Sequence, residues 1–267
     1  MSHRYAFTEQ SGPRRSSRGM IALAVLVVCA VVGGFFLHER MSVPPIQNAA
    51  KSAPQPAPLE ISTAPSVLFV GDSFTAGAGL GTHDGYSYIV CRTIGWNCDV
   101  DAQGATGFIS DGRAFRTDSN RAIDRLDEDK EIFSVDAVII DAGRNDLGYP
   151  ADRVLPAIAA YIAKVKSLWP TAKLAAIVPS YLSSIPYFTY PQIRDGYTRL
   201  AAAEGVTLID PVAEGWYRGI DISTLTNEAS PIHPSLYGAR FIAERIVRDL
   251  RDTGFLKQVE EQVSNGH

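Results

Sequence analysis

Four residues of this 267-residue chain are of the types that acyl transfer requires. Ser73 carries a hydroxyl, which becomes a good nucleophile only when a base removes its proton. His233 is the candidate base, because an imidazole titrates near neutral pH. The backbone N–H groups of Ser73 and Gly104 and the side-chain amide of Asn145 are donors of the kind that form an oxyanion hole. These four residues are therefore predicted to be catalytic.

Each of the four residues also has a purely structural explanation. Ser73 would otherwise cap the next helix, and Asn145 would do the same for the helix that follows it. Gly104 would supply only a positive backbone angle. His233 lies between prolines and would be a structural histidine in a stiff loop. The catalytic hypothesis depends on all four residues occurring together, in this order, on one sheet.

The elements that must bring these residues together alternate along the chain after residue 66. Five short apolar runs predict strands, at residues 67–70, 98–102, 135–141, 173–178 and 206–210. Four longer runs predict helices, at residues 86–96, 151–169, 191–204 and 234–250. This alternation predicts an α/β fold with a mostly parallel sheet that is covered on both faces.

The candidate residues occupy the expected end of that sheet. Ser73 follows the first predicted strand, Gly104 the second and Asn145 the third, while His233 precedes the last helix. Open α/β sheets bind their ligands beyond the C-terminal ends of the strands. We therefore expect the four residues to converge there.

Four short motifs resemble the conserved blocks of the SGNH (GDSL-type) hydrolases. They are Gly71-Asp72-Ser73, Gly104, Gly143-Arg144-Asn145-Asp146 and His233-Pro234, in the family's order and spacing. The resemblance implies a flavodoxin-like three-layer sandwich around a central, mostly parallel five-stranded sheet. It also implies Ser73 as nucleophile, His233 as base and an oxyanion hole from Ser73, Gly104 and Asn145, without a metal or an organic cofactor. Members of the family cleave acyl esters of carbohydrates and lipids as well as thioesters, and some transfer the acyl group.

Two positions depart from the family pattern. Arg144 stands where the family most often has threonine, which would place a cation near the pocket. Ser230 stands where the family has the acid that orients the histidine. Three explanations remain open: Glu228 or Asp221 reaches the histidine, a backbone carbonyl orients it, or the enzyme is weak or inactive.

The first 65 residues predict a membrane anchor and a spacer. Residues 1–19 carry four arginines against one glutamate and are expected to be cytoplasmic. Residues 20–37 contain no charge and are long enough to cross a bilayer as a helix. Residues 38–65 are rich in proline and alanine and read as an extended linker. We expect an uncleaved transmembrane anchor with an extracytoplasmic domain in the cell envelope; a cleaved signal peptide, giving a secreted protein, is the alternative.

The rest of the chain predicts one catalytic domain, at residues 66–256, and a C-terminal tail, at residues 257–267. The net charge of −4, without a cluster of basic residues, argues against binding to nucleic acid, and we expect a monomer. Cys91 and Cys98 form a disulfide if the domain is exported and are two buried thiols otherwise. Two cysteines with no histidine nearby do not make a zinc site.

The sequence thus supports two functions of different classes. The first is an exported, membrane-anchored serine ester hydrolase, or an acyltransferase, that acts on cell-envelope carbohydrate or lipid. The second is a domain of the envelope that binds acylated glycans or lipids without turnover, because Ser230 replaces the acid. The aromatic segment 180–190 either lines the substrate pocket or packs into the core, and packing is the more common use of aromatic side chains.

Overall fold

Five parallel strands form the centre of the computed structural model, which describes residues 64–182 and 189–265. The strands are β1 (Ser66–Gly71), β2 (Asn97–Ala102), β3 (Ala137–Asp141), β4 (Lys173–Ile177) and β5 (Thr207–Ile209). Their order in the sheet is β2-β1-β3-β4-β5, and every neighbouring pair is parallel. Gly71 pairs with Ala102 on one side and with Asp141 on the other. The C-terminal ends of the three strands that precede the candidate residues are therefore level with one another.

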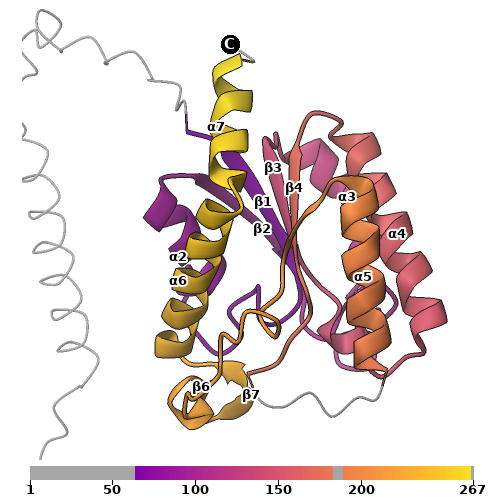
Figure 1. The fold of residues 1–267 in the computed structure, drawn as a ribbon. Helices are drawn as coiled ribbons and strands as arrows, with labels where there is room; N and C mark the ends of the chain where they lie inside the picture. The colour runs from indigo at the N-terminus through magenta and orange to yellow at the C-terminus, as the bar shows by residue number, and fades with distance from the viewer. Residues whose placement is uncertain (1–63, 183–188, 266–267) are drawn as a thin grey trace, which may run out of the picture. The chain divides into compact units, whose positions relative to one another are not determined.

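Helices cover both faces of the sheet (Figure 1). One face carries α2 (Tyr86–Ile94), α6 (Leu236–Asp252) and α7 (Phe255–Asn265), and the other carries α3 (Ala122–Ile132), α4 (Ala151–Leu168) and α5 (Tyr190–Glu204). The strands separate two apolar clusters, because side chains alternate between the faces: Leu68 contributes to the cluster under α3, α4 and α5, and Phe69 to the other. Residues 67–70 are wholly buried, which explains their unbroken apolar run.

The predicted α/β fold with a mostly parallel five-stranded sheet is confirmed. The predicted transmembrane segment, residues 20–37, lies outside the described residues. Within the ranges 64–182 and 189–265, no helix combines the length and the apolar composition needed to cross a membrane.

Several elements differ from those predicted. Helix α3 and the short hairpin of β6 (Thr226–Asn227) and β7 (Ser230–Pro234) were not predicted. The last predicted helix begins at Leu236 rather than at Pro234, because Ser235 caps it by accepting a hydrogen bond from the Gly238 N–H. Residues 257–265, which were predicted to be part of a C-terminal tail, belong to α7. This helix buries Phe255 and Val259 in the apolar cluster that also contains residues of α2 and α6.

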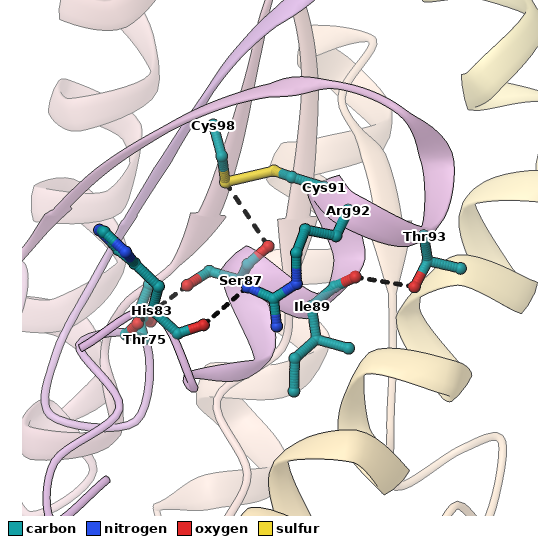
Figure 2. Close-up of a disulfide and its surroundings, with 8 residues drawn as sticks. All are labelled: Thr75, His83, Ser87, Ile89, Cys91, Arg92, Thr93 and Cys98. Atoms are coloured by element: carbon teal, nitrogen blue, oxygen red, sulfur yellow. Dashed lines mark hydrogen bonds between the residues drawn. A yellow bond between two sulfur atoms is a disulfide. The ribbon is translucent and has the colours of Figure 1, made fainter. Parts of the chain in front are cut away.

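The disulfide predicted between Cys91 and Cys98 is present and joins α2 to β2 (Figure 2). The two Cα atoms are 5.7 Å apart. Beside it, the Ser87 hydroxyl donates a hydrogen bond to the Thr75 carbonyl, at 3.2 Å, in the turn that follows Ser73. Helix α2 is thus fixed both to the edge strand and to the turn that holds the candidate nucleophile.

Candidate active site

Ser73 lies in a tight turn directly after β1. The Asp72 carboxylate accepts a hydrogen bond from the Phe74 N–H at 2.9 Å, and the Ser73 carbonyl accepts one from the Ala78 N–H at 2.9 Å. Gly71 permits this turn, because a Cβ atom there would lie 1.9 Å from Oγ1 of Thr75. The turn holds the Ser73 side chain at the C-terminal end of the sheet.

His233 reaches Ser73 from the β6–β7 hairpin. Its Nε2 atom lies 2.8 Å from the Ser73 Oγ, across 160 positions of sequence. The imidazole also packs beside the Phe74 ring, with 5.7 Å between the ring centroids. The predicted pair of hydroxyl and imidazole is therefore within hydrogen-bonding distance.

The second ring nitrogen of His233 contacts Ser230. The distance from Nδ1 to the Ser230 Oγ is 2.7 Å. Asp221 instead accepts hydrogen bonds from the N–H and the hydroxyl of Ser223, and Glu228 is exposed. The partner of the imidazole is thus the hydroxyl of Ser230, the residue that replaces the family's acid. None of the three explanations that the sequence left open had included this contact.

Burial lowers the pKa of His233 below its ordinary value of 6.5. No carboxylate among the described residues forms a hydrogen bond or an ion pair with the ring, so nothing of that kind opposes the effect of burial. A neutral imidazole is the form that can accept a proton, so His233 is ready to act as a base at neutral pH.

The candidate oxyanion donors come from three loops, those that follow β1, β2 and β3. A Cβ atom on Gly104 would lie 3.9 Å from the Cβ of Ser73, so the loop after β2 passes directly along the serine. In the described part of the chain, the N–H groups of Ser73 and Gly104 donate to no acceptor. The Asn145 amide donates one hydrogen bond to the Thr106 carbonyl, at 2.9 Å, and has a second N–H to offer. Gly104 thus lies beside Ser73, and Asn145 is bound to the same loop through Thr106.

Asp146 fixes the loop that carries Gly104. Its buried carboxylate accepts hydrogen bonds from the N–H groups of Phe108, Ile109 and Ser110, at 2.6, 3.3 and 2.9 Å. Burial raises the pKa of this carboxyl and the three N–H groups lower it, with a net rise. The sequence suggested a helix cap for Asn145 and Asp146, whereas their side chains hold the loop of the candidate oxyanion hole.

Arg144 places its cation near the pocket, but the guanidinium is buried and paired with carboxylates. Its side chain is 6% exposed, and its guanidinium contacts Asp141 at 2.7 Å and Asp72 at 3.4 Å. It also lies over the Phe74 ring, 4.4 Å from the centroid. Two buried carboxylates draw the arginine inward, because a buried charge needs a partner.

The cluster around Arg144 shifts the titration of its members. Burial is the largest influence on Asp72 and raises its pKa to about 6, although Arg144 opposes the rise. Burial alone would lower the pKa of Arg144, but Asp141 and Asp72 hold it above its ordinary value. Tyr86 completes the cluster by donating its hydroxyl hydrogen to the Asp141 carboxylate. The cluster lies directly behind the turn of Ser73 and supports it.

A second buried ion pair supports the neighbouring loop. Arg125, on the unpredicted helix α3, binds the Asp101 carboxylate at 2.7 Å and donates to the Asn120 carbonyl at 2.7 Å. A third contact, at 3.4 Å, reaches the Gly71 carbonyl at the end of β1. Arg125 was missed because a charged residue inside a charged helix gives no sign of being buried.

Among the residues at 64–182 and 189–265, no group of three or more His, Cys, Asp or Glu side chains is arranged to hold a metal ion.

Of the aromatic segment 180–190, Tyr181 is half-buried and packs edge-on against Phe74. Its hydroxyl donates a hydrogen bond to the Arg144 carbonyl at 3.2 Å. Tyr190 is buried. Of the described aromatic residues of this segment, Tyr181 thus packs at the site and Tyr190 in the core.

Comparisons with known proteins agree with this geometry. The profile of the GDSL-like Lipase/Acylhydrolase family matches residues 69–241. GDSL lipase Rv0518 of Mycobacterium tuberculosis is 27% identical over 198 residues, which cover 67% of this chain and 79% of that protein.

Solved structures show the same fold. Est24, a carbohydrate acetylesterase from Sinorhizobium meliloti, superposes with a TM-score of 0.55 at 17% identity, over 70% of this chain and 99% of its own. A family two carbohydrate esterase from Clostridium thermocellum gives a TM-score of 0.58 at 18% identity, over 70% of this chain and 63% of its own.

Proposed function

Because the chain belongs to the GDSL-like lipase/acylhydrolase family, we propose that it hydrolyses acyl esters with Ser73 as nucleophile and His233 as base. The observation that carries this proposal is the distance of 2.8 Å between the Ser73 Oγ and the His233 Nε2. A serine becomes reactive only when such a base takes its proton.

The reaction proceeds in two halves. The Ser73 Oγ attacks the ester carbonyl carbon while its proton passes to the His233 Nε2. The C–O bond to the alcohol then breaks, and the alcohol leaves with the proton from His233, so that an acyl-serine remains. Water attacks the acyl carbon in the second half, with His233 again accepting a proton, and the acid and free Ser73 are released. An acceptor alcohol in place of water would make the same site an acyltransferase.

The oxyanion of each tetrahedral intermediate is stabilised by the N–H groups of Ser73 and Gly104 and the Asn145 amide. This role is supported by the two N–H groups without an acceptor and by the second amide N–H of Asn145. Asp146 and Arg125 hold the loop rigid, so the donors need little reorganisation during the reaction.

For the substrate, we propose an acyl ester of cell-envelope carbohydrate or lipid, with the protein anchored to the membrane and its catalytic domain exported. The support is the uncharged segment 20–37 behind an arginine-rich start, and a disulfide that suits an oxidising compartment. Two structural relatives are named as carbohydrate esterases.

The test of catalysis uses the full chain, purified in detergent, with short p-nitrophenyl esters. We expect Ser73→Ala to abolish turnover and covalent labelling by a fluorophosphonate. Ser264→Ala changes an exposed serine on α7 and should leave both unchanged. Equal rates in Ser73→Ala and the unaltered protein would exclude Ser73 as nucleophile.

The absence of a carboxylate on the His233 Nδ1 favours a second candidate, a domain that binds acylated glycans or lipids without turnover. Calorimetric binding of acetylated oligosaccharides, with no acetate released and no label on Ser73, would support this candidate over the hydrolase.

A further inference from the structure

We propose that Ser230 is a positioning residue for His233, with its hydroxyl in the place of the triad's acid. This inference rests on the proposed function of Ser73 and His233. Ser230 touches neither substrate nor nucleophile and would act through the imidazole alone. The geometry behind it is a continuous chain of hydrogen bonds, from Ser230 Oγ through both ring nitrogens to Ser73 Oγ, at 2.7 and 2.8 Å.

The local structure holds Ser230 in this place. Ser230 begins β7 and His233 lies three residues later in the same strand, which pairs with β6 through Asn227 and Thr226. The Asn227 side chain donates to the Gly79 carbonyl at 3.2 Å and thereby ties the hairpin to the loop that follows Ser73. The hydroxyl and the imidazole are therefore carried by one element that is fixed relative to the nucleophile.

A hydroxyl differs from an ionised carboxylate because it carries a hydrogen and can donate a hydrogen bond as well as accept one. An ionised carboxylate only accepts hydrogen bonds, so it selects the tautomer with hydrogen on Nδ1 and leaves Nε2 free as a base. The Ser230 hydroxyl can accept from Nδ1–H or donate to a bare Nδ1. In the second case Nε2 carries the hydrogen and cannot take the proton of Ser73. Ser230 therefore orients the ring, while both tautomers remain accessible.

A hydroxyl is also uncharged, so it does not stabilise the imidazolium as a carboxylate would. Charged groups on the surrounding elements do not replace it. Arg144 pairs with both Asp72 and Asp141 behind the Phe74 ring, and Asp221 and Glu228 are exposed. Among the described residues, none of these four carboxylates contacts the imidazole. The base should therefore keep its low pKa as long as residue 230 is neutral.

The test compares four substitutions at position 230 by kcat/KM between pH 4 and pH 9. Ser230→Ala should lower kcat/KM about tenfold, the effect of one lost hydrogen bond. Ser230→Thr keeps the hydroxyl and should restore most of that loss. Ser230→Asp should raise the pH midpoint by about one unit or more, because an opposite charge favours the imidazolium. Ser230→Asn is the neutral match for aspartate and should leave the midpoint in place.

Imidazole ¹⁵N shifts provide a reading that does not need turnover. In protein labelled at histidine and assigned with His233→Gln, we expect both neutral tautomers for His233, and only the Nδ1–H tautomer in Ser230→Asp. The proposal is overturned if Ser230→Ala retains full kcat/KM, or if Ser230→Asp and Ser230→Asn give the same pH midpoint of kcat/KM. It is also overturned if the tautomer ratio of His233 is the same in all variants at position 230. Loss of the nucleophile's role would appear separately, as full activity in Ser73→Ala, and would leave the ¹⁵N result readable.

Discussion

At the scale of single residues, the proposed chemistry depends on an imidazole that is neutral and partly buried. Burial favours the uncharged ring, and the hydroxyl on its far nitrogen adds no negative charge. The carboxylate of a usual triad would oppose this effect of burial. With a serine at position 230, the imidazole should therefore stay neutral, and able to accept a proton, at a lower pH than it would beside a carboxylate.

We predict that kcat/KM rises with pH and reaches half its maximum below pH 6.5. Activity requires the neutral ring, and the pKa of His233 is lower than 6.5, so the ring loses its proton at a lower pH than a free histidine does. Initial rates with a non-ionising ester between pH 4 and pH 9 provide the measurement. A midpoint at pH 7 or above would contradict the prediction.

The sequence predicted Ser73, Gly104, Asn145 and His233 as one group from their order at the strand ends and before the last helix, and the structure brings Ser73, Gly104 and His233 together. The sequence could not assign the role of Ser230, since a serine in a loop has many uses and only the 2.7 Å contact defines this one. The direction of Arg144 was also beyond reach, because its burial depends on carboxylates brought together by two strands.

At the scale of elements, the loops of the site are held by charges rather than by apolar packing. Strands β1, β3 and β4 were predictable because they are buried on both faces and their sequences are apolar runs. Helix α3 was not, because its buried side includes Arg125 and Asp129 and gives no apolar stripe. The β6–β7 hairpin was missed because β6 has only two residues. Helix α3 and the β6–β7 hairpin, which the sequence did not predict, thus carry polar groups that contact the site.

Asp146→Asn should release the loop of residues 108–110 and lower the free energy of unfolding by about 3 kcal/mol. The amide has one oxygen where three N–H groups need acceptors, and its NH₂ group would face a donor. Urea unfolding measures the stability, and ester hydrolysis should fall in parallel because the loop carries Gly104.

Asp127→Asn is the matched control for this change, because its carboxylate is 73% exposed and forms one surface ion pair with Lys164. Its effect on the urea midpoint should be small. A result in which the two variants are equally stable would show that Asp146 does not hold the loop.

At the scale of the whole molecule, buried carboxyl groups tie stability to pH. Burial raises the pKa of Asp72 to about 6 and that of Asp129, on α3, to about 7. A carboxyl with a raised pKa binds its proton more tightly in the folded state. Its contribution to stability is therefore complete below pH 4 and is lost as the pH rises through 6 to 7. The lowered pKa of His233 acts in the opposite direction, but Asp249, with a pKa raised to about 6, and Asp146 act in the same direction as Asp72 and Asp129.

We predict that the domain resists urea better at pH 5 than at pH 7.5. Asp129→Asn should flatten this dependence, because the amide resembles the protonated acid and keeps the same shape beside Asp101. Unfolding curves at the two pH values, for the unaltered protein and the variant, test both statements. Greater stability at pH 7.5 in the unaltered protein would refute them.

Both ends of the described fold lie away from the catalytic edge (Figure 1). Strand β1 starts at Ser66 and ends beside the site, while α6 starts near His233 and runs back toward α7, which ends at Asn265. An enzyme immobilised on beads through residue 64 or residue 265 would therefore keep its reactive edge open to the solution. The same arrangement lets a fluorescent reporter be fused at either point without covering Ser73 and His233.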